Sequence, residues 1–303
     1  MNDALLPQLE FPFESGMIPR RHPAPAGRVW LRLRRNGAGL AGFGMVGLFA
    51  LIAFAAALGI VGQDWSVTSG GRWEPVSASH WFGTNLLGQD IFQRTVFSVR
   101  IAFEIGLIVA LASTALGTLT GLLAGWFADS WIDGVVVFVT GVLDSIPFYL
   151  FVAAVAFALK GSAWAMHIAM VATFWTTTSR LMRAEVMRLK HRDFVQAARA
   201  IGLPVSLILS RHVMPNTVQI LLAQAAIVFV ASIKSEVILS FLGLGIKDGV
   251  SWGLMLAEST QEVLAGQFNN FLAASIPLFL LVFGFNLLVD ALQDAFDPRQ
   301  ADA

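Results

Sequence analysis

The chain has 303 residues, of which 56% are hydrophobic and only 13% are charged. Soluble domains carry roughly a quarter charged residues, so a chain this apolar cannot cover a water-exposed surface and must place several segments in lipid. Lys plus Arg and Asp plus Glu both total 20, which leaves no positive excess for nucleic acid or another polyanion. Cysteine is absent, which excludes disulfides and thiolate metal sites.

Six apolar stretches are each long enough to cross a bilayer, which takes about 20 residues of helix. Helices are predicted because backbone polar groups have no water partner in hydrocarbon. The acidic, proline-bearing stretch 1–20 that precedes them does not fit a cleaved signal peptide. The predicted spans are residues 39–62, 101–127, 134–159, 164–181, 216–243 and 271–291.

Lys and Arg predict the orientation, because cytoplasmic segments are enriched in them. One basic cluster lies in the N-terminal tail, and a second follows the fourth span, between residues 183 and 211. Four predicted crossings separate the clusters, so both are expected in the cytoplasm, and two more return the C-terminus there. The expected organisation is a cytoplasmic tail (1–38), a first span (39–62), an extracytoplasmic loop (63–100), a five-helix core (101–291) with a coupling loop (184–215), and a cytoplasmic tail (292–303).

The basic segment between the fourth and fifth spans predicts two short cytoplasmic helices. Glu185–Ile201 forms the first, Gly202 takes the left-handed position that ends it, and Pro204 begins the second. Small side chains would let the first helix settle into a groove on a soluble motor protein. The alternative is a helix lying on anionic lipid with its arginines among the headgroups. The candidate coupling residues are Gln196, Ala197, Ala198, Gly202, Pro204 and Pro215.

The string Gln196-Ala197-Ala198, followed by Gly202 and Pro215, resembles the EAA-type loop of ABC importer permeases. In that loop, Glu-Ala-Ala is followed by a glycine and, further on, by a proline. Gln196 stands where the family usually has Glu, which keeps the size and the hydrogen bonding but loses the charge. The resemblance implies that this segment couples the membrane part to an ATPase.

Four other stretches resemble the dipeptide/oligopeptide/nickel subfamily of these permeases, in the same order along the chain. Residues 82–90 are similar to its outer segment, and residues 144–147 to its third-span Asp-x-x-Pro. Residues 236–253 resemble its Glu-x-x-Leu-Ser-Phe-Leu-Gly-Leu-Gly…Trp-Gly signature, and residues 290–298 its C-terminal Asp-x-x-x-Asp-x-x-Asp-Pro. The long N-terminal tail and short outer loop resemble the C-type subunit.

The resemblance implies an all-α polytopic bundle of six transmembrane helices with a cytoplasmic coupling helix, the type I ABC importer permease fold. The implied function is a permease subunit of the bacterial inner membrane, forming half of a pathway for peptides or related small solutes, nickel chelates included. The implied partners are a second permease subunit, two ATPase subunits or domains, an extracytoplasmic substrate-binding protein and membrane lipid, but no nucleic acid. The sequence has no G-x-x-x-x-G-K-[ST], so we expect no enzyme activity and no bound cofactor or metal in this chain, with ATP used by its partners.

Charged residues inside the predicted spans are candidate functional groups, because a charge at the bilayer centre costs about 2.5–3.5 kcal/mol. Asp144, Lys234 and Glu236 qualify as pathway or bundle residues, and Glu104 is a further candidate. Pairing within the bundle is the plainer interpretation of these groups. An ion-gradient-driven secondary transporter, using the carboxylates as ion sites, is the alternative function, and a non-transporting scaffold is a third.

Three glycines on the second span repeat every fourth residue, at Gly117, Gly121 and Gly125. They form one small face, which lets the backbone of a neighbouring helix approach closely. A helix-packing surface is therefore predicted there, and lining a translocation path is the alternative use of the same face.

Overall fold

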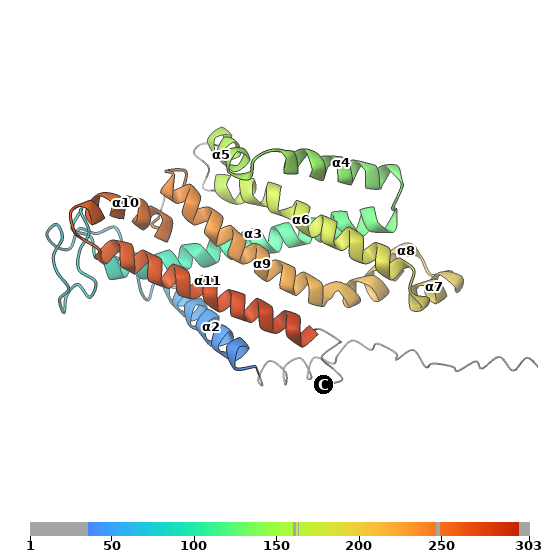
Figure 1. Ribbon diagram of the computed structural model, residues 1–303, viewed down its shortest axis with the longest axis horizontal. Coiled ribbons are helices and arrows are strands. Elements are labelled where there is room, and N and C mark those ends of the chain that lie inside the picture. The colour runs from blue at the N-terminus through green and yellow to red at the C-terminus, as the bar shows by residue number, and fades with distance from the viewer. Residues whose placement is uncertain (1–35, 160–161, 163, 247–248, 297–303) are drawn as a thin grey trace, which may run out of the picture.

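The computed structural model describes residues 36–159, 162, 164–246 and 249–296, and every regular element in these ranges is a helix (Figure 1). The predicted all-α helix bundle is thus confirmed. The helices are α2 (Gly37–Ala57), α3 (Ile91–Trp126), α4 (Trp131–Ser145), α5 (Phe148–Ala158), α6 (Ala165–Lys190), α7 (Asp193–Ala200), α8 (Val205–Ile208), the π-helix η1 (Leu209–Val213), α9 (Met214–Phe241), α10 (Trp252–Leu264) and α11 (Asn269–Phe296).

Four helical stretches of the described chain are long and apolar enough to cross a membrane. They are α2, α3, α11 and the stretch Val205–Phe241, which comprises α8, η1 and α9. The pair α4 and α5 adds a fifth if the two are counted as one span. The predicted number of six spans is not confirmed, because α6, which covers the predicted fourth span, is not among these stretches and is basic in its last turn.

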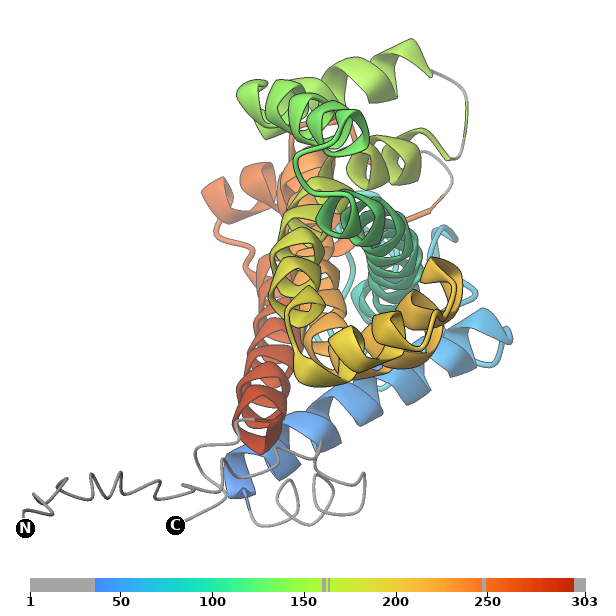
Figure 2. The same ribbon diagram turned by 90° about the vertical axis from the view of Figure 1, so that its right-hand side faces the viewer.

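The predicted third span, residues 134–159, is not one straight helix. α4 ends at Ser145, α5 begins at Phe148, and the two helices are bent by 94°. Pro147 has no N–H to donate and disfavours helical backbone at the residue before it. Ile146 is accordingly extended, with φ −90° and ψ 130°. The bend brings α5 against α6 (Figure 2).

α3 and α6 form the most extensive helix pair of the bundle. The glycine face of α3 consists of Gly117, Gly121 and Gly125. A methyl group added at any of the three would lie within 2.8 Å of a Cβ atom on α6, namely that of Thr178, Met182 or Val186. The predicted packing surface is therefore confirmed, and it holds the two backbones closer than side chains larger than hydrogen would permit.

The other long helices complete the bundle around this pair. α9 packs against α3, and α2 pairs with α11 on the side away from α4 and α5 (Figure 2). In the α2–α11 pair, a Cβ atom at Gly42 would lie 2.7 Å from the carbonyl oxygen of Gly284. A large core joins α3, α6, α9 and α11, with Phe229 stacked on Phe285 at 4.2 Å between ring centroids.

The two ends of the bundle differ in structure, and Figure 1 shows them at opposite sides. At one end, α10 and the loop 58–90 cover the helices; we call this the α10 end. At the other end, α7, α8 and η1 turn back across a second, smaller core formed with α3 and α6; we call this the α7 end. The functional candidates divide between these two ends.

A buried arginine fastens the loop 58–90 to α10. Arg94 is 2% exposed, and its guanidinium group donates to Glu258 at 2.6 Å and to Gln89. The backbone N–H of Leu86 also donates to Glu262 at 2.7 Å. Burial raises the pKa of the Glu258 carboxyl group above its ordinary value, although the positive charge of Arg94 opposes the shift. α3 begins at residue 91, ten residues before the predicted span, so Arg94 lies within its first turns.

The motif at residues 82–90 forms the turns that precede α3. Gly83 and Gly88 have positive φ values of 76° and 73°. Asp90 is the N-cap of α3, and its side chain accepts a hydrogen bond from the N–H of Gln93 at 3.1 Å. Two glycine turns and a capping aspartate thus lead into α3, and the loop 58–90 also holds two isolated bridges.

Candidate functional site

Residues 191–213, which hold most of the predicted coupling residues and which we call the coupling segment, project across the α7 end. α6 ends at Lys190, and α7 starts again at Asp193 after a turn at His191 and Arg192. The single predicted helix Glu185–Ile201 is therefore wrong, because Arg192 is extended, with ψ 146°, and interrupts it. Asp193 then occupies the first turn of α7, where its negative charge complements the helix dipole.

The glycine and prolines of the segment sit at its turns. Gly202 has φ +77°, as predicted, and its N–H donates to the carbonyl of Arg199 at 2.9 Å. Only glycine adopts this conformation without a steric cost. Pro204 is the N-cap of α8, and Pro215 lies in the first turn of α9, beyond η1. The structure thus places Pro215 on a different helix from the other candidate coupling residues.

The Gln-Ala-Ala motif on α7 is divided between two surfaces. Ala198 is 4% exposed and packs, with Val195, into the small core of the α7 end. Gln196 and Ala197 lie on the exposed surface. Ala198 is therefore occupied by contacts within this chain, whereas Ala197 is available to another protein.

α7 also carries an exposed apolar stripe that was not predicted from the sequence. Phe194 is 41% exposed and Ile201 is 75% exposed, and Ala197 lies between them. Positions separated by three, four and seven residues share one face of a helix, so these residues form a continuous surface, which we call the α7 stripe. The spacing of Phe194, Ala197 and Ile201 in the sequence already predicts a shared helix face.

The coupling segment is attached to the last turn of α3. The ammonium group of Lys190 donates to the carbonyl of Trp126 at 2.6 Å, and the Arg199 guanidinium lies 4.3 Å from the Trp126 ring centroid. The amide of Gln196 donates to the carbonyl of Lys190 at 2.8 Å. An ionised glutamate at this position could not donate that hydrogen bond. Glutamine, in place of the family's usual glutamate, thus ties α7 to the end of α6.

The three charged candidates within the spans do not form a common site. Asp144 pairs with Arg180 of α6 at 2.5 Å and accepts a hydrogen bond from Thr176 at 3.0 Å. Glu236 is buried and accepts from Ser240 at 2.5 Å. Lys234 lies on the exposed face of α9. Glu236 therefore has a partner inside the bundle, whereas Asp144 pairs with Arg180 on the exposed surface. Lys234 and Glu236 point to different faces, as their spacing predicts.

A second ion pair joins the same two helices as Asp144 and Arg180. Asp133, at the start of α4, accepts two hydrogen bonds from Arg183 at 2.6 and 2.7 Å. This bidentate contact raises the pKa of the Arg183 guanidinium and keeps it charged. Both carboxylates of α4 are thus neutralised by α6, which fixes the orientation of the bent α4–α5 pair.

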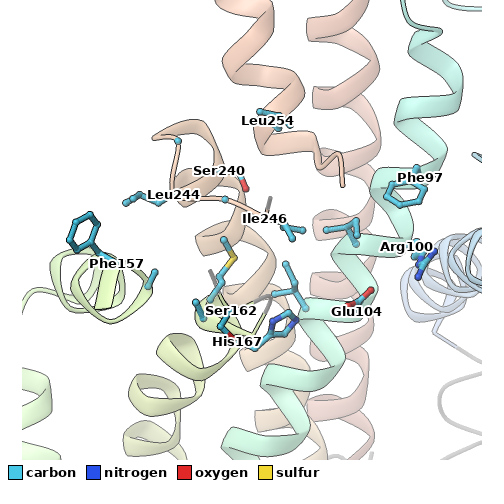
Figure 3. A pocket seen from close by; sticks show the side chains of 17 residues that line it. Phe97, Arg100, Glu104, Phe157, Ser162, His167, Ser240, Leu244, Ile246 and Leu254 are labelled. Atoms are coloured by element: carbon cyan, nitrogen blue, oxygen red, sulfur yellow. The ribbon is translucent and has the colours of Figure 1, made fainter. Parts of the chain in front are cut away.

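A cavity of about 480 Å³ lies toward the α10 end, between α3, the end of α5, the start of α6 and the segment 243–246 (Figure 3). Its lining is mostly apolar, with residues such as Ile101, Met166 and Leu254. Arg100 and Glu104 of α3 also line it. The volume is in the range that holds small-molecule ligands, about 300–1,000 Å³. Within the described ranges, no three His, Asp or Glu side chains are grouped to hold a metal ion.

The fold and these sites define a polytopic α-helical membrane protein, with the helical segment 191–213 at one end and a cavity toward the other. Residues 117–302 match the family described as binding-protein-dependent transport system inner membrane component. The chain belongs to this family and is a permease component of an ATP-driven (ABC) importer. The secondary-transporter alternative is not favoured.

Three relatives illustrate the range of the family. The dipeptide transport system permease protein DppC of Bacillus subtilis (strain 168) is 31% identical over 278 residues, covering 89% of this chain and 85% of the relative. The oligopeptide transport system permease protein OppC of Mycobacterium bovis is 36% identical over 228 residues, covering 74% and 78%. The glutathione transport system permease protein GsiD of Pectobacterium atrosepticum is 35% identical over 228 residues, covering 75% of each chain.

Proposed function

We propose that this chain is the C-type permease subunit of a peptide importer, and that the α7 stripe is its contact with the ATPase. The observation that carries the coupling role is the exposure of Phe194 and Ile201 on a helix that is otherwise fastened to α3 and α6. Large apolar side chains held on a rigid exposed helix are typical of protein contacts. Peptides are the proposed substrate class because relatives named for dipeptides, oligopeptides and glutathione all resemble this chain.

The proposed complex contains a second permease subunit, two ATPase subunits or domains and an extracytoplasmic substrate-binding protein. The α7 end and both termini would then face the cytoplasm, as the basic residues predict. ATP would bind only to the ATPase subunits, since this sequence has no phosphate-binding loop of the Walker type. This chain would bind no cofactor and would supply half of the pathway lining.

Two helices, α3 and α6, would carry the movement of the ATPases to the cavity. α6 is continuous from Ala165, which lines the cavity, to Lys190, which leads into the coupling segment. At 1.5 Å per residue, a helix of 26 residues spans about 39 Å. α3 also lines the cavity, and its last turn contacts Lys190. Because the glycine face holds α3 and α6 together, a push on α7 would move both helices as one unit.

The experiment that tests the ATPase contact is truncation of the α7 stripe. Phe194→Ala combined with Ile201→Ala should weaken co-purification of the ATPase subunits and lower substrate-stimulated ATP hydrolysis by at least about tenfold, since contacts at the centre of an interface cost more than 1 kcal/mol each. Leu264→Ala is the matched control, because Leu264 is an 85% exposed apolar residue at the α10 end.

Both outcomes of this experiment are informative. If the double variant kept full ATPase binding and coupled hydrolysis, the stripe would not be the contact, and a helix lying on lipid would be the better interpretation. Orientation is checked separately with single cysteines in this cysteine-free chain. Cysteine in place of Ser77 should react with an impermeant reagent in intact cells, and cysteine in place of His191 should not; the reverse pattern would overturn the orientation.

A further inference from the structure

We propose that the cavity toward the α10 end is a subsite for zwitterionic peptides, in which Arg100 receives the substrate carboxylate and Glu104 its ammonium group. The inference rests on the proposed peptide importer and names residues that would contact its substrate. It begins from two opposite charges on α3 that line one cavity of about 480 Å³ among apolar side chains.

The placement of these charges needs an explanation. Arg100 and Glu104 are one helical turn apart, where opposite charges commonly pair with each other. Yet no ion pair within 4.0 Å joins them among the described residues. Arg100 is half-buried and Glu104 is exposed where they line the cavity, so both charged groups are accessible to a ligand. A substrate that brings both a carboxylate and an ammonium group would neutralise both at once.

The remaining lining fits the middle of such a substrate. The Arg100 guanidinium lies 5.5 Å from the ring centroid of Phe97, which restricts where it can move. Apolar side chains come from α3, α5 and α6, and Figure 3 shows Ile246 and Leu244 reaching the cavity from the segment after α9. An apolar amino-acid side chain could be buried against them without leaving a polar group unpaired. The chemical class is thus a short peptide with free termini and an apolar residue.

The position of the cavity also suits transport. It lies at the end of α6 opposite the coupling segment, and α3 contributes to both places. A shift of α3 against α9 would alter the distances between Arg100, Glu104 and the opposite wall. A charge-pairing subsite on a helix that moves with the ATPases can hold a substrate in one state and release it in another.

A thiol-protection experiment on the complete complex in liposomes tests the subsite. Ala156 lines the cavity from α5, and Ala156→Cys places a single thiol in this chain, whose labelling can be read by mass spectrometry. The probe is the dipeptide Ala-Phe. At about ten times its dissociation constant, bound Ala-Phe should slow labelling about tenfold. The same peptide with an acetylated N-terminus and an amidated C-terminus should give no protection.

The charge variants are then made in the Ala156→Cys background. Arg100→Gln and Glu104→Gln should each weaken Ala-Phe binding at least about tenfold, because each removes a hydrogen bond between oppositely charged groups. Protection at the same concentration would then fall to about twofold. Arg72→Gln and Asp64→Asn are matched controls, since they remove the same charges from exposed loop positions outside the cavity.

The results separate this subsite from the proposed importer function. Full protection in both charge variants, or equal protection by the blocked peptide, would overturn the zwitterion subsite. If the wild-type complex transports Ala-Phe but Ala156→Cys is not protected, the subsite is wrong and the importer function stands. If the wild-type complex transports no peptide at all, the proposed function itself fails. Loss of protection in the two charge variants alone, with the controls unchanged, supports the subsite.

Discussion

The glycine face between α3 and α6 makes a quantitative prediction. In Gly121→Ala, the new methyl group would lie 2.5 Å from the carbonyl oxygen of Ser179 and 2.6 Å from the Cβ atom of Met182. Both distances are well below ordinary contact, so α3 and α6 must separate locally. Overpacking of this kind costs about 1–3 kcal/mol. Alanine favours helix over glycine by about 0.5–1 kcal/mol. The expected net loss is therefore about 0–2.5 kcal/mol, and about 1 kcal/mol at the middle of both ranges.

Gly141→Ala is the matched control for this substitution. Gly141 is also in a helix, α4, but a Cβ atom there would meet nothing within 4 Å. The control should therefore gain the helical preference, about 0.5–1 kcal/mol, without the clash. The measurement is thermal unfolding of the detergent-solubilised complex followed by tryptophan fluorescence. If Gly121→Ala were as stable as Gly141→Ala, the close approach of α3 and α6 would not be the source of their packing.

Two further predictions concern the carboxyl groups of Glu236 and Glu258. Glu236→Gln should be nearly as stable as the wild type, because an amide still hydrogen-bonds to Ser240, whereas Glu236→Leu should lose about 1–3 kcal/mol in thermal unfolding by leaving that hydroxyl unpaired. A Gln variant that stayed stable but lost transport would instead show that an ionisable group is needed. Glu258 has a raised folded pKa, so it binds its proton more tightly in the folded chain, and the free energy of unfolding should fall as pH rises above about 4.5 toward that folded pKa. Glu258→Gln should flatten this part of the stability profile between pH 4 and 7, and an unchanged slope would contradict the assignment.

Local structure was predictable from the sequence where a residue type determines the backbone geometry. Gly202 was expected at a left-handed turn and has φ +77°. The glycine repeat on α3 predicted a packing face because small residues permit close contact in any bundle. The break at Pro147 was also predictable, since the residue before a proline avoids helix. The continuous apolar run 134–159 favoured a single straight span instead.

The remaining features depend on tertiary contacts that one sequence does not display. Ala197 and Ala198 are identical residues, and only the small core at the α7 end decides that the second is buried. The sequence shows Arg100 and Glu104 only as two charges on one helix. Their common cavity is formed by α5, α6 and the segment 243–246, which are distant from α3 in the sequence. The turn at His191 and Arg192 contains neither glycine nor proline, so nothing in the local sequence marked it.

The contacts of Arg94 constrain how the chain can be made. Its partner Glu258 lies 164 residues later in the chain. At about 5–20 residues translated per second, Glu258 is therefore synthesised roughly 10–30 s after Arg94. During that interval the loop 58–90 cannot pack against α10, and the Arg94 guanidinium has no carboxylate of α10 to pair with. A chain truncated before α10 would contain every earlier helix but would lack Glu258. The positive charge of Arg94 would then have no compensating carboxylate on α10. Quality-control proteases could therefore recognise unfinished copies by their open α10 end.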